Sequence, residues 1–437
     1  MLPFPVGRTD IHKKDFFIPP EAQMRHSAIF GKSGTGKSTL MRNMMVWDIH
    51  NDVGLTGLDP HADLISDVLD NIPKRRAGDV IYLNLLDPER AIGINPLQRV
   101  SEAQKPLVVS RIIKMLQNIW SAFWGPQTEF ILSNLVAALL DQKQPTTFLA
   151  LLKMLTDEDY RDFIAAKSSD PVVKLSLQMY SEQWGDRFRT EASAPLLNKI
   201  GKLVGNPLAR AVLGQNTSSF NFRAMMDSKK ILLCELPKGT LGDDVSSLIG
   251  STVVSMLSLA ALTRADTPER HRVPHKLYAD EVQNFIKAVD LPTILAEARK
   301  YKLALTIATQ TIDQLPEESR ASVFGNCGTI ISFRVSSEDA KLIADDFADP
   351  TITAAQLQNL PDYRAYVKTL IKLNKESSAL IPSNSLVNSH PPMVARKSYR
   401  DAIVKTSRER YGRLKTQIEK QHEKFLERRS PTPDNAR

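Results

Sequence analysis

Cysteine is scarce in this chain of 437 residues, which contains only Cys234 and Cys327. Two cysteines cannot build a disulfide framework or a four-ligand zinc site. The composition therefore excludes the disulfide-rich secreted domains, and the reducing environment of the cytoplasm fits it best.

Long hydrophobic runs are also missing. The longest apolar stretch, residues 248–262, spans only 15 positions and includes four serine or threonine residues. A membrane-spanning helix needs about 20 predominantly apolar residues, so this stretch predicts a buried helix. The first residues contain no basic segment followed by an apolar run, which argues against a secretory signal. We therefore expect neither a secreted protein nor a direct membrane span.

The excess positive charge of the chain is concentrated in a single segment. The net charge is +8, and residues 396–429 contain twelve Lys or Arg against five Asp or Glu, so about +1 remains for the rest of the chain. With 42% hydrophobic and 24% charged residues, the composition is that of a globular protein. The length predicts two or three domains.

Apolar runs typical of strands occur in two separate parts of the chain. They occupy residues 27–30, 53–58 and 79–83, and then residues 231–234, 276–279, 303–308 and 328–333. Strands that alternate with helices predict an α/β fold with a mostly parallel sheet. Between residues 101 and 225 the apolar residues recur at helical spacing, as they do at Ile112, Met115, Leu116, Ile119 and Phe123. This pattern predicts an all-helical insertion.

The predicted boundaries divide the chain into six parts. Residues 1–100 and 226–381 are the two parts of the α/β domain, 101–225 the helical insertion, 382–395 a Pro-, Ser- and Asn-rich linker, 396–430 a basic helix and 431–437 a disordered tail. The basic helix has a narrow seam, formed by Tyr411, Leu414, Ile418, Gln421 and Phe425. It fits packing on the chain's own domain, or contact of the flanking cations with phosphates or an acidic partner.

A phosphate-binding loop is the clearest motif. Gly31-Lys-Ser-Gly-Thr-Gly36-Lys37-Ser38 fits the pattern G-x-x-x-x-G-K-[ST], with an apolar strand before it and a helical pattern after it. Such a loop points backbone N–H groups at phosphates, its lysine reaches the β- and γ-phosphates, and its hydroxyl binds Mg²⁺. The residues predicted to bind nucleotide are Gly31, Ser33, Gly34, Thr35, Gly36, Lys37, Ser38 and Thr39.

Hydrolysis requires further groups, and two strand ends offer them. Asp280 and Glu281 follow the strand of residues 276–279, where Asp280 is placed to bind Mg²⁺ together with Ser38, and Glu281 to act as general base. An Asp-Glu pair at this position is often only a helix cap, but the phosphate-binding loop favours the catalytic interpretation. Gln310 ends the next strand, where it either positions water beside the γ-phosphate or only forms a turn.

Two arginines are candidates for a finger that reaches a neighbouring subunit's nucleotide, namely Arg299 and Arg334. An arginine at an exposed helix end usually pairs locally or is solvated. Composition alone does not choose between the two.

Taken together, these motifs resemble a known family. They include residues 58–64 (Leu-Asp-Pro-His-Ala-Asp-Leu), 92–97 (Ile-Gly-Ile-Asn-Pro-Leu), 280–285 (Asp-Glu-Val-Gln-Asn-Phe), 297–301 (Glu-Ala-Arg-Lys-Tyr), 308–310 (Ala-Thr-Gln) and 324–334. In this order they resemble the coupling-protein ATPases of conjugative type IV secretion, of the TraD and TraG type, within the HerA–FtsK superfamily of P-loop DNA translocases. The resemblance covers about residues 20–375.

The resemblance implies a RecA-like motor domain that works as a hexameric ring around DNA, with ATP and Mg²⁺ at the subunit interfaces. By motif, the residues it implies are Lys37 and Ser38 for nucleotide and Mg²⁺, Asp280 and Glu281 as the Walker B pair, Gln310 as the γ-phosphate sensor and Arg299 as the better finger. The expected partners are DNA contacted through its backbone, further copies of the chain, and secretion-channel or relaxosome proteins.

Two features depart from the family. Membrane-bound coupling proteins carry N-terminal transmembrane helices, whereas this chain reaches its phosphate-binding loop by residue 31 without one. We therefore expect a cytoplasmic protein, or one held at the inner face of the membrane through a partner. In addition, Ala62 follows His61 where related soluble ATPases would have glycine.

The preferred function is therefore an ATP-hydrolysing DNA translocase. Three alternatives remain at this point: a secretion ATPase that powers protein export or pilus assembly without DNA, a HerA-like DNA-processing motor, and a nucleotide-dependent switch that barely hydrolyses ATP.

Overall fold

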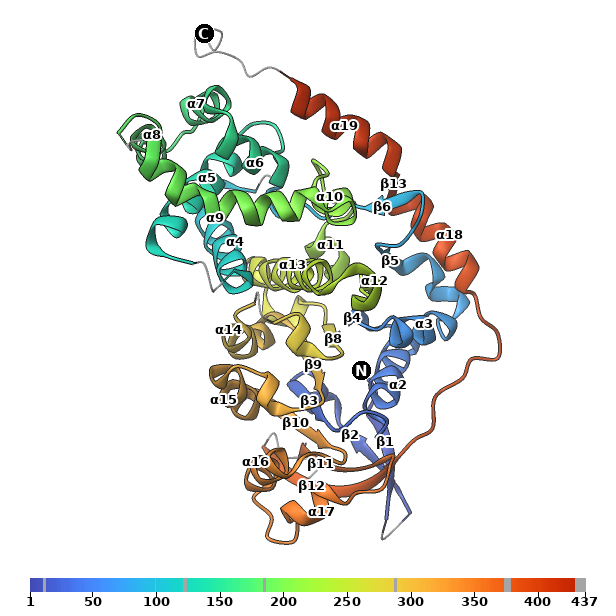
Figure 1. The fold of residues 1–437 in the computed structure, drawn as a ribbon. Helices are drawn as coiled ribbons and strands as arrows, with labels where there is room; N and C mark the ends of the chain where they lie inside the picture. The colour runs from blue at the N-terminus through green and yellow to red at the C-terminus, as the bar shows by residue number, and fades with distance from the viewer. Residues whose placement is uncertain are drawn as a thin grey trace.

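A parallel sheet forms the centre of the structure (Figure 1). The computed structural model describes residues 1–10, 13–98, 100–120, 124–183, 186–286, 289–372 and 379–428. In sheet order, the parallel strands are β10 (Cys327–Ser332), β3 (His26–Phe30), β9 (Leu303–Thr309), β8 (His275–Ala279), β4 (Gly54–Asp59), β7 (Ile231–Glu235) and β5 (Val80–Asn84). Each lies within one residue, at either end, of a predicted strand. The predicted α/β class with a mostly parallel sheet is therefore confirmed.

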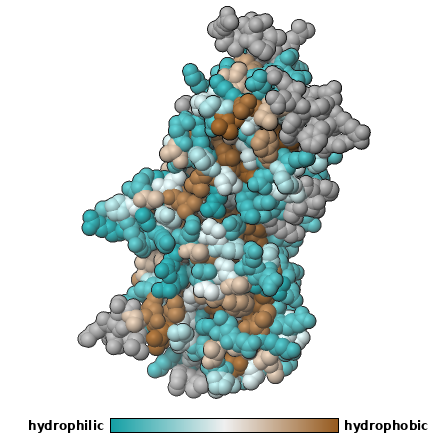
Figure 2. All heavy atoms as spheres, turned by 90° about the vertical axis from the view of Figure 1, so that its left-hand side faces the viewer, coloured by the Kyte–Doolittle hydropathy of each residue, from teal (hydrophilic) through white to brown (hydrophobic). Residues whose placement is uncertain are grey.

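Helices cover both faces of this sheet, which explains why its strands are continuous apolar runs. One face packs against α2 (Lys37–His50), α3 (Asp63–Asp70) and α18 (Arg400–Tyr411). The other face packs against α13 (Asp243–Leu262), α14 (Leu291–Glu297), α15 (Glu317–Asn326) and α16 (Ser337–Phe347). Shorter helices are α1 (Pro20–Gln23), α11 (Phe222–Asp227), α12 (Lys238–Leu241) and α17 (Ala354–Gln358). On the surface view of Figure 2, hydrophobic residues form several separate patches among hydrophilic ones.

The predicted buried helix is α13. Within the described residues, the stretch Asp243–Asp266 is long and apolar enough to cross a membrane, but 78% of its most apolar window is buried inside the molecule. Its hydroxyl groups find partners there, because Ser246 Oγ donates to the Leu236 carbonyl and Ser251 Oγ to the Phe285 carbonyl, both at 2.7 Å. The stretch is therefore a core helix of this fold.

An antiparallel extension continues the sheet beyond β10 and corrects the predicted linker. Its strands are β11 (Arg364–Lys372), β12 (Leu380–Ser389), β1 (Phe4–Thr9) and β2 (Asp15–Ile18). Most of the region predicted as a linker, residues 382–395, is thus strand β12, paired with β11 in continuous register. The prediction was wrong because ladder hydrogen bonds join backbones and tolerate the Ser, Asn and Pro residues of this strand. The sequence also did not predict β1 and β2.

Helices fill the region between β6 (Arg90–Ile92) and β7, at the end of the molecule far from β11 (Figure 1). They are α4 (Lys105–Ile119), α5 (Pro126–Leu140), α6 (Phe148–Thr156), α7 (Glu158–Ala166), α8 (Pro171–Gln178), α9 (Asp186–Gly205) and α10 (Pro207–Leu213). Side chains that accept hydrogen bonds from the first turn set the start of several, namely Thr147, Asp157, Asp170 and Asn206. Phe123, which belonged to the predicted helical spacing, lies outside the described residues.

The C-terminal segment runs along one side of the molecule from the sheet to the helical region (Figure 1). The predicted single helix of residues 396–430 is in fact two helices, α18 and α19 (Lys415–Glu427). The short strand β13 (Gly412–Leu414), paired with β6, separates them. The single-helix prediction was wrong because this pairing replaces the helical hydrogen bonds at Gly412. Residues 429–437, including the predicted disordered tail, lie outside the described part of the chain.

Contacts within the chain hold both C-terminal helices. Ile403 is buried in the core cluster that also contains residues of α3, and Arg408 forms ion pairs with Asp87 at 2.5 Å and Glu89 at 3.0 Å. In α19, Ile418 is buried, and the Phe425 ring packs edge-on against Tyr160 with 5.9 Å between ring centroids. These contacts favour the interpretation in which the seam packs on the chain's own domains.

Candidate nucleotide-binding and hydrolytic site

The phosphate-binding loop joins β3 to α2 and depends on its glycines. Gly34 and Gly36 have φ angles of 77° and 118°, in the left-handed region that side chains rarely adopt. At Gly31 a Cβ atom would lie 2.7 Å from Phe333 Cβ and 2.8 Å from Thr35 Oγ1, so only glycine fits. The loop therefore wraps tightly around the start of α2, with Ser33, Gly34 and Ser38 exposed and Thr39 half-buried.

Lys37 is buried inside this loop. Its Nζ donates to the Gly31 carbonyl at 2.6 Å and to the Lys32 carbonyl at 3.2 Å. Burial lowers the pKa of the ammonium group, and the carboxylates of Glu281 and Asp280 oppose that shift. The cation thus lies inside the loop that the sequence predicts to bind phosphate.

Asp280 connects the loop to β8, which lies two strands away from β3. Ser38 Oγ donates to Asp280 Oδ2 at 2.9 Å. Burial raises the pKa of Asp280, and the hydrogen bond from Ser38 acts in the opposite direction. The Ser38 hydroxyl and the Asp280 carboxylate lie within hydrogen-bonding distance of each other, and both are hard oxygen ligands of the kind that Mg²⁺ binds. These two residues therefore fit the ion.

Glu281 follows Asp280 in a left-handed conformation, with φ 44° and ψ 58°. Its side chain is buried, and Gln283 Nε2 donates to its Oε2 at 2.8 Å. The neighbouring Asn284 donates to the Glu281 carbonyl at 2.8 Å and accepts from Lys238 at 2.9 Å. Sequence reasoning missed Gln283, although an amide two residues after an acid at a strand end is a signal it could have used.

Asp59, at the end of β4, is a further buried carboxylate that sequence reasoning did not assign. It accepts backbone hydrogen bonds from His61 at 2.8 Å and Ile65 at 3.1 Å. Burial raises the pKa of Asp59, and its charge helps to raise the pKa of Asp280. Its position at the carboxyl end of a strand beside β8 was visible in the motif of residues 58–64. In the same turn Ala62 has φ 78°, which explains why glycine would be favoured there.

Gln310 directly follows β9, the strand between β3 and β8. In the sheet register Thr309 lies opposite Phe30 and Ile307 opposite Ala279. The half-buried Gln310 therefore lies between the start of the phosphate-binding loop and Asp280. The structure thus brings the loop, Asp280, Glu281 and Gln310 to one edge of the sheet.

The two arginine candidates lie in different places. The Arg334 carbonyl accepts from Lys32 N at 2.8 Å, and its guanidinium pairs with Asp362 at 2.7 Å and with the Leu360 carbonyl at 3.1 Å. Arg334 is therefore held beside the phosphate-binding loop of its own subunit.

Arg299 is exposed in a short 3-10 helix, Ala298–Tyr301, just before the amino end of β9. Burial and the charge of Arg299 together lower the pKa of His26, the first residue of β3, to about 4. Because β3 contains five residues and a strand rises about 3.3 Å per residue, Arg299 is roughly 16 Å from its own loop. The structure therefore does not bring Arg299 to the site of its own subunit.

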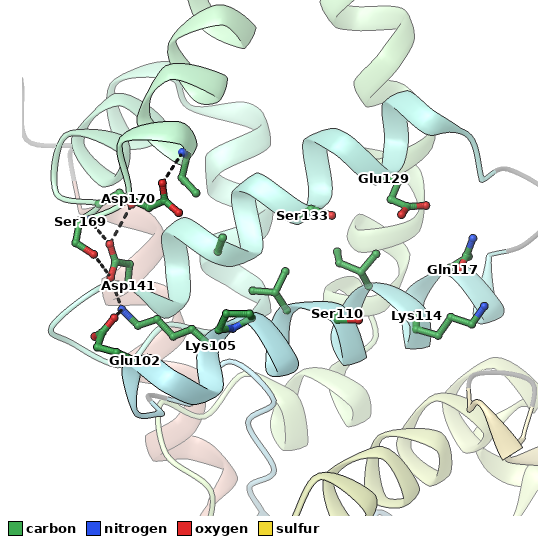
Figure 3. A pocket seen from close by; sticks show the side chains of 16 residues that line it. Glu102, Lys105, Ser110, Lys114, Gln117, Glu129, Ser133, Asp141, Ser169 and Asp170 are labelled. Carbon is green, nitrogen blue, oxygen red and sulfur yellow. Dashed lines mark hydrogen bonds and ion pairs between the residues drawn. The ribbon is translucent and has the colours of Figure 1, made fainter. Parts of the chain in front are cut away.

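A separate groove lies between α4 and α5 in the helical region (Figure 3). It has a volume of about 790 Å³, and at one end Asp141 accepts hydrogen bonds from Lys105, from Ser168 Oγ at 3.0 Å and from Ser169 Oγ at 2.9 Å. None of the predicted site residues lines it. Within the described residues there is also no group of three or more His, Cys, Asp or Glu that could hold a metal ion.

Comparison with known proteins bears on the fold of this chain. Residues 274–364 match a family model described as the TraM recognition site of TraD and TraG. The unbound bacterial conjugative coupling protein TrwB is similar in structure, with a TM-score of 0.62, 15% identity and 88% of both chains covered. The chain has the fold of a conjugative coupling protein. The resemblance to the TraD and TraG type predicted from sequence is therefore confirmed.

Two further structures share this fold. TrwB in complex with ADP and Mg²⁺ matches with a TM-score of 0.61 and 16% identity, over 87% of this chain and 89% of that one. VirB4 of Thermoanaerobacter pseudethanolicus matches with a TM-score of 0.53 and 14% identity, over 89% of this chain and 96% of that one. No curated protein matches the sequence.

Proposed function

We propose that this chain is an ATPase that works as a ring oligomer and moves DNA, as a coupling ATPase of conjugative DNA transfer or type IV secretion. The observation that carries the proposal is the contact between Ser38 and Asp280, because it joins a phosphate-binding loop to a metal-binding carboxylate. The fold shared with TrwB and the TraD and TraG family match support DNA as the cargo.

In the proposed reaction, the N–H groups of the loop and the Lys37 ammonium hold the phosphates of ATP. Ser38 and Asp280 would hold Mg²⁺, which neutralises charge on the β- and γ-phosphates when it is bound. Glu281 accepts a proton from the attacking water, and Gln283 orients its carboxylate. Gln310, beside the loop, positions that water or senses the γ-phosphate.

Arg299 is the proposed finger that acts on a neighbouring subunit. It is exposed and far from its own loop, whereas the Arg334 guanidinium is bound to Asp362 in its own subunit. An arginine that works only across an interface requires a neighbour at every site, which a closed ring of identical subunits provides. A hexamer is the ring that the family resemblance implies.

The proposed partners are DNA, contacted through its backbone, and proteins of the relaxosome or secretion channel. The family model over residues 274–364 supports this part of the chain as a docking region for a relaxosome protein. We propose a cytoplasmic location, or a peripheral one at the inner face of the membrane through a partner.

The test is the steady-state ATPase rate with and without DNA, at low and moderate salt, with Lys37→Ala as the blank. We expect several-fold stimulation that grows with DNA length and weakens as salt rises, because phosphate contacts release counterions. A real but DNA-indifferent rate would favour a secretion ATPase, a role that the VirB4-like fold supports. No rate under any condition would contradict both.

A further inference from the structure

Tyr363 is an unusual residue beside the phosphate-binding loop. Its side chain is 53% exposed, although it is large and aromatic, and its φ angle is 63°. A bulky side chain in the left-handed region is a genuine conformational outlier, and such outliers persist only where the surroundings impose them. Such outliers concentrate at ligand-binding positions, so this conformation suggests a role for Tyr363 in binding a ligand.

Hydrogen bonds impose this conformation from three sides. Tyr363 N donates to the Thr35 carbonyl of the loop at 2.9 Å. The Tyr363 carbonyl accepts from Ser389 N at 2.8 Å and from Ser389 Oγ at 3.0 Å, which ties it to the end of β12. The Arg334 guanidinium holds the residues before Tyr363 in place through an ion pair with Asp362 and a hydrogen bond to the Leu360 carbonyl. The turn between α17 and β11 is therefore fastened to the loop itself.

The aromatic ring lies over the last glycine of the loop. A Cβ atom built on Gly36 would lie 3.1 Å from Tyr363 Cδ1 and 3.1 Å from Phe333 Cε1. Phe333 is fully buried and serves packing, whereas half of Tyr363 faces solvent at the start of α2. An exposed π-face thus stands next to the N–H groups that would hold phosphates.

We propose that Tyr363 is the residue of the nucleotide site on which the base stacks. Phosphates bound by residues 31–38 leave the nucleoside to extend over the outer side of the loop, where this ring stands. Stacking recognises the π-face that every base has, so it adds affinity without reading the base edge. This inference rests on the proposed nucleotide site and names the part of it that binds the base.

The experiment compares Tyr363→Leu and Tyr363→Phe with the unaltered chain. Leucine removes the ring but keeps an apolar side chain under the same backbone constraint, and phenylalanine keeps the ring. Binding of ATP and of GTP is measured by calorimetry with Mg²⁺, and KM and kcat are measured in parallel. Inorganic tripolyphosphate, which has no base, serves as the probe of the phosphate subsite.

For Tyr363→Leu we expect affinity for ATP and GTP to fall about tenfold, as is typical for the loss of one stacked base. The loss should appear in KM rather than in kcat, tripolyphosphate should bind as before, and Tyr363→Phe should keep most of the affinity. Phe17→Leu removes another exposed aromatic ring, on β2, and should leave the affinities for ATP, GTP and tripolyphosphate unchanged.

Equal losses for tripolyphosphate and ATP would overturn the inference, because Tyr363 would then only shape the loop. Unchanged ATP affinity in Tyr363→Leu would also overturn it. The binding measurements do not depend on hydrolysis or on DNA. Failure of the proposed function would therefore appear in the unaltered chain, and failure of this inference only in the comparison of variants.

Discussion

Three carboxylates, Asp59, Asp280 and Glu281, end neighbouring strands in the interior of the protein. Burial raises the pKa values of Asp59 and Asp280. The folded protein thus binds the proton of Asp280 more tightly than the unfolded chain does. Keeping Asp280 charged therefore costs folding free energy at neutral pH, and this cost disappears as the pH falls through the raised pKa.

We predict that Asp280→Asn abolishes ATP hydrolysis while it stabilises the protein. The free energy of unfolding should rise by about 1 kcal/mol at pH 7, because the variant removes a buried charge beside two others and keeps the polar shape. The stability difference should shrink as the pH is lowered. Thermal unfolding between pH 4 and 8, without nucleotide or Mg²⁺, measures the stability difference and its pH dependence, and the steady-state ATPase rate measures the loss of hydrolysis.

Asp345→Asn is the matched control, because Asp345 is exposed on α16. It should change the free energy of unfolding by less than about 0.5 kcal/mol at any of these pH values. An Asp280→Asn protein that unfolds at a lower temperature than the unaltered chain at pH 7 would show that the carboxylate is net stabilising, against this account.

At the scale of elements, the C-terminal helices are fastened to two regions that are distant in sequence. Ile403 of α18 is buried in the core cluster that also contains residues of α3, and Ser407 Oγ of the same helix accepts a hydrogen bond from Tyr82 N of β5 at 2.8 Å. In α19 His422 hydrogen-bonds to the Gly214 carbonyl after α10 at 2.9 Å. The segment therefore joins the sheet to the helical region, and its attachment depends on apolar packing as well as on its charge.

We predict that Ile403→Ala destabilises this attachment by about 2–4 kcal/mol, because it leaves a cavity under α18. Ile403 has no exposed surface, whereas Val394, nine residues earlier, is 81% exposed. Val394→Ala should therefore have almost no effect. Limited proteolysis after residue 393, followed by intact mass measurement, should show faster release of the C-terminal segment only in Ile403→Ala. Equal cleavage of both variants would contradict the packing account.

At the scale of the whole molecule, the sheet separates the two arginine candidates. Arg334 lies at the carboxyl edge with the nucleotide site, and Arg299 lies at the amino edge. A site that needs Arg299 must therefore receive it from another copy of the chain. This separation is the structural basis of the proposed ring.

We predict that Arg299→Ala and Glu281→Gln subunits, each inactive alone, regain part of the ATPase activity when they are mixed. Some interfaces would then combine an intact Glu281 with an intact Arg299. Native mass spectrometry should confirm that mixed oligomers form. Verified mixed oligomers without any activity would contradict a trans-acting Arg299, and a mixture of Arg334→Ala with Glu281→Gln tests the other arginine.

Local spacing in the sequence was sufficient for the features that depend on short stretches of chain. The loop of residues 31–38 is a single continuous motif, and the strands of the parallel sheet are continuous apolar runs because both of their faces are buried. The pair Asp280 and Glu281 follows such a run directly. The sequence also predicted the α/β class and the resemblance to coupling proteins.

Only the tertiary structure decided the features that depend on partners distant in sequence. Strand β12 exists because β11 and β1 pair with its backbone, and β13 interrupts the predicted helix because β6 lies beside Gly412. Asp59, Gln283 and Tyr363 acquire their roles from neighbours brought together by folding. Backbone pairing, burial and close approach depend on contacts between residues that are distant in sequence. A pattern of residue types along the chain therefore does not predict them.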